Sequence, residues 1–364
     1  MISDDLFRRL VTAASRAPSP DNMQAWAFTN VGDAIEVRLE PTRVLPTDVH
    51  QMFAWVGLGA AVENLILAAE LDGYVATVDD DLLHSTAAGT PDEPRRVSTP
   101  VTVRLSPGDP ASRLGEQIER RETNRGTYDT ALLEPRTIED LSAAVAGLDA
   151  GVHWATGAQA LDRLAGMDAR STYIRLEHRP LHDELFDILR FSRSEVEHTR
   201  FGLDFASLGI PVALVSVARL LRHPAVMKVV SRLGIGRLVA RQLAAKLRKA
   251  GAVCLITARS PGAAGYVHAG RAMERLWLEA TAGGLAVQPH GVLPQYLTKL
   301  DDKTDAFTPR QTATMARHRE PFARLFPTRE GERPAIVLRV GRPRCRPARR
   351  SVRLPVERLI RSAR

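Results

Sequence analysis

The sequence predicts an α+β protein built from two similar halves, with a mostly helical insertion in the second half. Two long apolar segments carry this prediction, "GLGAAVENLILAAELDGYVATV" and "HAGRAMERLWLEATAGGLAVQP". Each has small residues early, a leucine-rich helical face and a glycine-terminated exit into a strand. The chain has 364 residues, which is enough for two such units.

The first half is expected to span residues 1–112. Apolar positions at helical spacing predict a helix over 4–16, which has to end before Pro18. "AWAFTNV" and "AIEVRLEP" predict a hairpin of two strands around a Gly-Asp turn. A long buried helix then ends at Gly73, and "TPVTVRLSP" predicts a further strand.

The second half is expected to span residues 113–345, with a basic helical insertion at about 181–250. "PRTIEDLSAAVAGL" predicts an amphipathic helix capped by Thr137. Strands are predicted at "GVHWATG", "GAVCLITARS" and "PAIVLRVG". Residues 346–364 form a basic tail, for which a solvated extension and an end docked on the other half are both open. The apolar positions of "VRLPVERLI" favour docking.

The net charge of +8 is compatible with nucleic acid, anionic lipid or a phosphorylated ligand as a partner. The arginines gather in 219–249 and in the tail, without interleaved aromatic residues. Single-stranded nucleic acid is normally bound by such aromatics, so no nucleic-acid partner is expected. Most of these arginines also fit a plain solvated face.

The two cysteines, Cys254 and Cys345, are too few for a metal cluster or a disulfide framework. This predicts a cytoplasmic protein without a metal. The N-terminus is acidic from the start and does not resemble a secretory leader. The apolar run at 208–221 contains Arg219 and is too short to cross a bilayer, so no membrane span is expected.

The segment "APSPDNMQAW" (17–26) combines two prolines with short polar side chains and a tryptophan. Proline stiffens a loop, and Ser, Asp and Asn can bond either nearby backbone or a ligand. The segment is therefore either a turn anchored by Trp26 or a rigid loop that holds a flat polar ligand.

This loop resembles the A-P-S-x-x-N-x-Q-P-W loop of the flavin-dependent nitroreductase superfamily, with Ala25 at the usual proline position. "ERRETNRGTY" (119–128) resembles the R-R-S-x-R-x-F/Y box of that family, with Thr123 at the serine position. "LEATAGGLAVQPHGVLP" and "VLRVGRP" resemble its flavin-covering loop and last strand. The loop precedes the box, an order similar to that of Acg-type nitroreductases, in which one chain carries two nitroreductase-like halves.

The resemblance implies a nitroreductase-like fold, internally duplicated as a pseudo-dimer, with a helical lid insertion. It implies one bound FMN per chain, NADPH or NADH as the electron donor, and a small organic acceptor in a ping-pong cycle. The chemistry is centred on the flavin, so no catalytic side chain is expected. A chain that completes its own site would be a monomer, although a homodimer through other surfaces stays open.

The resemblance also implies which residues contact the cofactor. The two-proline loop and the arginine box would hold the ring and the phosphate, the segment after the second long helix would cover the ring, and the tail would supply a second phosphate clamp. The expected cofactor-binding residues are Pro18, Ser19, Pro20, Asn22, Gln24, Arg121, Thr123, Arg125, Gln288, Pro289, His290, Gly291, Arg349 and Arg350.

Three other functions remain open on the sequence. An insertion that closes over the ring would make a low-turnover flavin-binding or flavin-sequestering protein. A flavin-dependent oxidase or dehydrogenase of a specialised metabolite would use the same residues. Finally, the insertion could lie on a membrane surface, with its arginines on anionic lipid.

Overall fold

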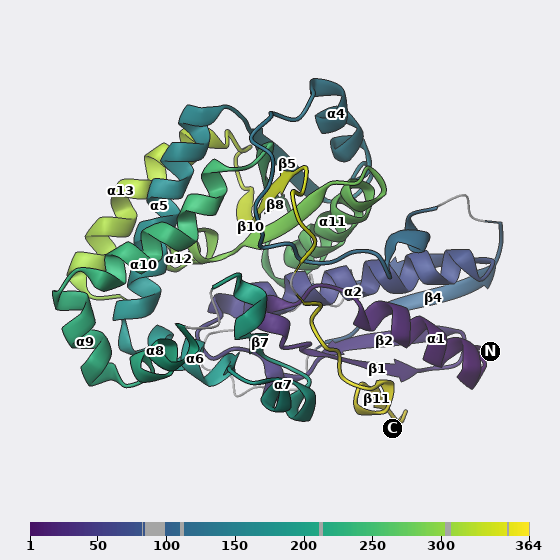
Figure 1. Ribbon diagram of the computed structural model, residues 1–364. Helices are drawn as coiled ribbons and strands as arrows, with labels where there is room; N and C mark the ends of the chain where they lie inside the picture. The colour runs from purple at the N-terminus through teal and green to yellow at the C-terminus, as the bar shows by residue number, and fades with distance from the viewer. Residues whose placement is uncertain are drawn as a thin grey trace.

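The computed structural model describes residues 1–81, 83, 99–109, 113–210, 214–302, 307–347 and 349–363. Two sheets are separated by a central pair of long helices, α2 and α11, and a helical layer covers the outer side of the second sheet (Figure 1). The expected α+β class is confirmed. The expected boundary between the halves adjoins residues 110–112, which lie outside the described residues.

The first sheet and its helices come from the beginning of the chain. Its elements are α1 (Asp4–Ser15), β1 (Trp26–Asn30), β2 (Ala34–Leu39), α2 (Met52–Leu71), β3 (Tyr74–Asp79) and β4 (Val101–Pro107). The strands lie in the order β1-β2-β4-β3 and pair antiparallel. The helix and hairpin predicted here are confirmed.

The second sheet repeats this order. Its elements are α4 (Pro135–Ala143), β5 (Ala150–Ala155), β8 (Ala252–Ala258), α11 (Gly262–Ala282), β9 (Ala286–His290), α12 (Val292–Asp301), α13 (Pro309–Leu325) and β10 (Arg333–Gly341). The strands lie in the order β5-β8-β10-β9 and are again antiparallel. Leaving aside a fifth strand that the C-terminal tail adds to the first sheet, the four strands of each sheet therefore lie side by side in the order first, second, fourth, third, counted along the chain.

The predicted cap of α4 is wrong. Glu134 is the N-cap residue and Pro135 occupies the first helical position, so Thr137 lies inside the helix. Proline favours this position because its φ angle already fits a helix and the amide it lacks would have no partner there.

The insertion between β5 and β8 is mostly helical and begins earlier than expected, at α5. Its elements are α5 (Ala158–Glu177), α6 (Arg179–Ile188), β6 (Leu189–Arg190), α7 (Arg193–Thr199), β7 (Leu203–Asp204), α8 (Val215–Leu221), α9 (Pro224–Arg232) and α10 (Ile235–Ala244). Its short parallel pair β6–β7 was not predicted. Residues 211–213 of the expected lid lie outside the described residues.

The helices α2 and α11 cross closely because each has a glycine at the contact. A Cβ atom on Gly59 would lie 2.0 Å from the carbonyl oxygen of Val267, and one on Gly270 would lie 2.0 Å from that of Val56. The stretch Val49–Leu71 is apolar and long enough to cross a membrane, but 89% of its apolar 18-residue segment is buried inside the protein. It is thus the central core helix of this fold.

The C-terminal tail crosses from the second sheet to the first. Strand β11 (Ile360–Arg361) pairs in parallel with β1, with Ile360 opposite Phe28. Leu354 and Leu359 are buried in the main core. The tail is docked, and it passes the end of α1 on its way (Figure 1).

Candidate functional site

A cavity of about 380 Å³ lies where the two-proline loop, the end of β9 and the insertion meet. Its wall is largely apolar, and much of that wall comes from α6, α8, α10 and the segment around β7. The predicted residues that line it are Pro18, Ser19, Pro20, Asn22, Thr123, Arg125, Gln288, Pro289, His290 and Gly291.

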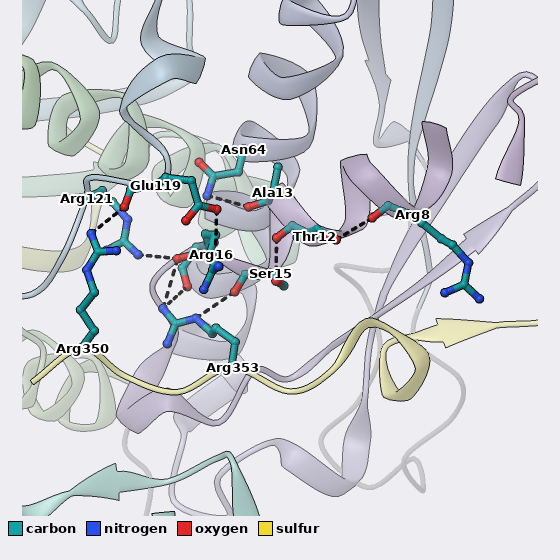
Figure 2. Close-up of polar contacts among 11 residues, drawn as sticks. Arg8, Thr12, Ala13, Ser15, Arg16, Asn64, Glu119, Arg121, Arg350 and Arg353 are labelled. Carbon is teal, nitrogen blue, oxygen red and sulfur yellow. Dashed lines mark hydrogen bonds and ion pairs between the residues drawn. The ribbon is translucent and has the colours of Figure 1, made fainter. Parts of the chain in front are cut away.

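A smaller pocket of about 40 Å³, here called the arginine annex, adjoins this cavity. The two spaces share four lining residues, Thr123, Arg125, Ser351 and Arg353. The annex is also lined by the arginines Arg16, Arg121, Arg349 and Arg350 and by the acids Glu119 and Glu122. Figure 2 shows several of these side chains converging between the end of α1 and the tail.

The two-proline loop is held by its own polar side chains and by the tail. The Ser19 hydroxyl accepts a hydrogen bond from the amide of Gln24 at 3.0 Å. The Asn22 side chain donates to the carbonyl of Val352 at 3.0 Å. Asp21, Asn22 and Gln24 have positive φ angles of 46°, 59° and 51°. Asp and Asn are among the residues that tolerate this region best, so the polar sequence fits the backbone as well as a ligand.

Gln24 is fully buried behind the loop and is absent from the lining of the cavity. Its side chain donates to the carbonyl of Arg200 at 2.9 Å and accepts from the amide of Leu354 at 2.8 Å. It therefore fastens the loop to the insertion and to the tail. This differs from a direct contact with a ligand in the cavity.

Arg121 lines the annex and is almost completely buried. Its Nε atom lies 3.0 Å from Oε1 of Glu274, and its guanidinium lies 4.7 Å from the centre of the Trp277 ring. It also donates to the carbonyl of Arg16 (Figure 2). Burial raises the pKa of Glu274 to about 7. Glu274 is therefore only partly ionised near neutral pH, and it compensates part of the positive charge of Arg121 inside the protein.

Arg125 differs from the other arginines of the box. It lines both the cavity and the annex. Across the described ranges its guanidinium has neither a hydrogen bond nor an ion pair within 4 Å. Burial lowers its pKa, while the more distant carboxylate of Asp21 acts in the opposite direction. Asp21 itself pairs with Arg175 of α5 at 2.9 Å. Arg125 is only partly exposed to solvent. A partly desolvated cation without a partner is costly, and an anionic or hydrogen-bond-accepting ligand would relieve that cost.

The end of β9 is positioned by Arg339 of β10. The buried Arg339 guanidinium donates to Oε1 of Gln288 at 2.8 Å and to the carbonyl of Gly126 at 3.1 Å, and it lies 3.6 Å from the ring centre of Tyr128. These contacts join the arginine box to the segment after α11. This role was not predicted, because the sequence of an apolar strand gives no sign of which groups a buried arginine within it bonds.

His290 and Gly291, which follow in this segment, also line the cavity. A Cβ atom on Gly291 would lie 2.5 Å from Cζ of Phe53, so a larger residue there would displace that ring. Nδ1 of His290 lies 3.6 Å from Oδ2 of Asp168, which comes from α5 and also lines the cavity.

The two predicted tail residues reach the annex but are paired. Arg350 lies 3.0 Å from Glu122, and Arg349 lies 3.6 Å from Asp204 of the insertion. Arg353, which was missing from the predicted contacts, is less exposed than either of them. Burial, followed by the charges of Arg121 and Arg16, lowers its pKa to about 9.

The insertion supplies further cavity residues that the sequence analysis did not single out, among them Arg175, Lys246 and Glu184. Lys246 donates to the carbonyl of Leu208 at 2.9 Å, and Glu184 accepts from the amide and the hydroxyl of Thr47 at 2.7 and 2.6 Å. The described residues contain no cluster of His, Cys, Asp or Glu that could hold a metal ion.

The fold and the site define an α+β protein with a largely apolar cavity beside an arginine-lined pocket. Comparison with models of known protein families finds no match. The chain is 26% identical over 322 residues to the uncharacterized protein MT1398 of Mycobacterium tuberculosis (strain CDC 1551 / Oshkosh), which covers 88% of this chain and 43% of that protein. The chain therefore spans less than half the length of this relative.

Several solved structures are similar at low identity. The FMN-dependent nitroreductase NfnB from Mycobacterium smegmatis, in complex with NADPH, is 16% identical with a TM-score of 0.40, over 68% of this chain and 97% of that one. A nitroreductase with bound FMN from Desulfitobacterium hafniense is 12% identical with a TM-score of 0.36, over 70% and 100% of the two chains. Scores this low leave the function to be argued from the residues of the chain itself.

Proposed function

We propose that this chain is an FMN-dependent oxidoreductase of the nitroreductase type. The observation that carries the proposal is the guanidinium of Arg125, which lacks a partner in the described part of the chain and lies where the apolar cavity meets the arginine annex. This position suits a ligand with a flat, polar-edged ring on one side and an anionic group on the other. FMN has both parts.

The residues present fit that cofactor. The apolar wall would cover the ring, and Ser19 and Thr123 offer hydroxyl groups at the cavity. Arg121, Arg349 and Arg350 line the annex, where a phosphate would be bound by cations. Arg349 and Arg350 would have to exchange their contacts with Asp204 and Glu122 for the phosphate, whereas Arg125 has no contact to give up.

When bound, FMN would supply hydride and electron transfer in a ping-pong exchange between NADPH or NADH and a small organic acceptor. The chain's own contribution is positioning and electrostatics. The cationic side chain of Arg125 would favour negative charge on a ligand beside it, and Lys246 adds a second cation to the same wall. The apolar side chains of the insertion would exclude water. The proposal includes a cytoplasmic location.

The proposal also includes an internal duplication, with halves at 1–112 and 113–345 and a tail at 346–364. The matching strand orders and the paired glycines of α2 and α11 support it. Val56, Gly59 and Glu63 of α2 precede Val267, Gly270 and Glu274 of α11 by a constant 211 positions. Because the loop and the arginine box lie in one chain, that chain would complete one FMN site by itself.

A second candidate function is flavin sequestration with little turnover. It is favoured by the apolar side chains that the insertion contributes to the cavity, among them Phe186, Leu203 and Phe205. They would exclude a second substrate as well as water. The two functions share the binding site and differ only in whether a second substrate can reach the bound flavin.

The first experiment measures bound flavin. The visible spectrum of the purified protein and the FMN released on denaturation should give one FMN per chain, at every oligomeric state. Mixing Ser19→Phe with Arg125→Met should restore no binding, since each chain would keep one damaged site. Recovery of binding on mixing would show that the site forms between chains.

The second experiment measures turnover of the flavin-loaded protein with NADPH or NADH and a nitroaromatic acceptor. Sustained oxidation of the donor supports the oxidoreductase. Retained flavin without turnover supports sequestration. A protein that binds no FMN under any condition would contradict both functions.

A further inference from the structure

The outer faces of α8, α9 and α10 carry most of the exposed apolar side chains in the described part of the chain. Seven of the twelve exposed large apolar residues lie here. They are Leu214, Val217, Leu220, Val229, Leu233, Ile235 and Leu238, between 43% and 70% exposed. Figure 1 shows these helices at the periphery of the molecule, with α9 at its outer edge. Such a concentration on one short stretch is typical of an interaction surface.

The same stretch is exclusively basic. Residues 214–249 contain nine Lys and Arg and no Asp or Glu. Arg219 and Arg222 reach acids elsewhere, at 3.7 Å from Glu195 and 3.4 Å from Asp187. By contrast, no hydrogen bond or ion pair to any described residue engages several other exposed cations of this stretch, among them Lys228, Arg232 and Arg241.

On α9 and α10, exposed apolar and basic side chains occur together, away from the residues that these helices bury. On α10, Gly236, Ala240 and Ala244 are buried, and Leu238 and Arg241 face outward. On α9, Met227 is buried and its neighbours Lys228 and Val229 are exposed. We call the seven exposed apolar residues together with Lys228, Arg232 and Arg241 the basic–apolar surface.

We propose that the basic–apolar surface docks on an anionic phospholipid membrane. Leucine and valine side chains can enter the boundary between headgroups and acyl chains, while the neighbouring cations remain at the phosphates. A nucleic acid would use the cations and leave the leucines exposed to water. Charge complementarity to an anionic lipid leaflet accounts for both sets of side chains.

The surface lies directly outside the cavity. Ala218 and Leu221 of α8 and Val239 and Leu243 of α10 line the cavity from within, on the helices that form the surface. Docking would place this wall of the cavity against the lipid. The inference is tested by binding alone, so it holds or fails independently of the proposed flavin chemistry.

The test uses the full chain and vesicles of phosphatidylcholine, with and without phosphatidylglycerol, in co-sedimentation. We expect binding to the anionic vesicles, weakened by salt, and little binding to the neutral ones. Replacing Lys228, Arg232 and Arg241 together by Gln should weaken binding roughly 100-fold, because each cation near an anionic surface contributes about fivefold. Circular dichroism checks that each variant is folded.

The matched control replaces Arg310, Arg317 and Arg329 by Gln, which removes the same charge from exposed positions elsewhere. It should retain most of the binding. An equal loss in both triple variants would mean that only the net charge matters, and that result would overturn the proposal.

The apolar contribution is tested with the triple variant Leu220→Ser, Leu233→Ser, Leu238→Ser. We expect a loss of roughly tenfold or more, including the binding that remains at high salt. The control Leu71→Ser, Val75→Ser, Leu132→Ser changes exposed apolar residues outside the surface. Wild-type vesicle binding by the first variant would overturn the proposal. A wild-type dimer that the first variant converts to a monomer in sedimentation velocity, without vesicle binding, would assign the surface to a second copy of the chain.

Discussion

Nη1 of Arg353 donates a hydrogen bond to Oδ1 of Asn22 at 2.5 Å, which joins the C-terminal tail to the two-proline loop. The same guanidinium donates to the carbonyls of Ser15, Arg16 and Ala17 at 2.9–3.1 Å. Figure 2 shows Arg353 reaching back to the end of α1. The wall of the cavity is therefore held by a residue more than three hundred positions away in the sequence.

Replacing Arg353 by Gln should destabilise the ligand-free protein by about 3 kcal/mol, because several buried carbonyl groups would lose their donor. Urea unfolding measures this. The matched control is Arg349→Gln, whose side chain is 46% exposed and whose loss should change the free energy of unfolding by less than about 0.5 kcal/mol. Equal effects of the two substitutions would contradict the bracing role of Arg353.

Replacing Arg125 by Met should change binding and stability in opposite directions. FMN affinity should fall roughly thirtyfold, for the loss of about 2 kcal/mol of charge-assisted contact. The ligand-free protein should be equally stable or more stable, because the guanidinium has no partner among the described residues. FMN titration and urea unfolding measure the two quantities.

The control for this substitution is Arg120→Met, because Arg120 is an exposed neighbour in the same motif and lines neither pocket. It should leave both quantities nearly unchanged. FMN affinity that survives the loss of Arg125 would remove the main support for the proposed site.

Replacing Gly59 by Ala should cost at least about 2 kcal/mol, because the added methyl group would lie 2.0 Å from a backbone carbonyl of α11. Thermal unfolding measures this. Gly166 of α5 is the control, since a Cβ atom there meets nothing within 4 Å. Gly166→Ala should stabilise the protein by up to about 1 kcal/mol through helix propensity. Similar melting temperatures for both variants would show that α2 and α11 can separate without cost.

The fourth prediction concerns Asp48, whose side chain accepts hydrogen bonds from the amides of Phe53 and Ala54 at the start of α2, at 3.1 and 2.9 Å. Burial raises its pKa from 3.8 to about 7. The folded state therefore holds this proton more tightly than the unfolded state. The stability that Asp48 contributes should be present below pH 4 and lost as the pH rises through about 7.

Unfolding free energies of the wild type and of Asp48→Asn, measured between pH 4 and pH 8, test this. The wild type should lose stability relative to the variant as the pH rises, by up to about 1.4 kcal/mol per pH unit. Glu274 titrates in the same range but is present in both proteins, so it cancels in the difference. A difference that stays constant with pH would show that Asp48 is ionised throughout.

The sequence by itself determined most of the secondary structure and the composition of the site. Periodicity and terminal glycines predicted α2 and α11, and alternation predicted the strands, because these signals depend on neighbours in the chain. The composition of the two-proline loop, and the resemblance of the arginine box and the segment 288–291 to motifs of the nitroreductase superfamily, placed these three segments among the candidates. The structure brings these three segments to one cavity.

Only the tertiary structure decided which charged side chains are paired within the protein and which are available to a ligand. Arg121 and Arg125 are four positions apart in one motif, yet Arg121 is paired with Glu274 and Arg125 lacks a partner in the described structure. Arg353 and Arg349 are likewise four positions apart in the tail. Arg353 is partly buried and bonded to α1 and the two-proline loop, whereas Arg349 is half exposed. Pairing and burial depend on residues that are distant in sequence and meet only when α2, α11 and the tail pack together, and a local pattern contains no information on those contacts.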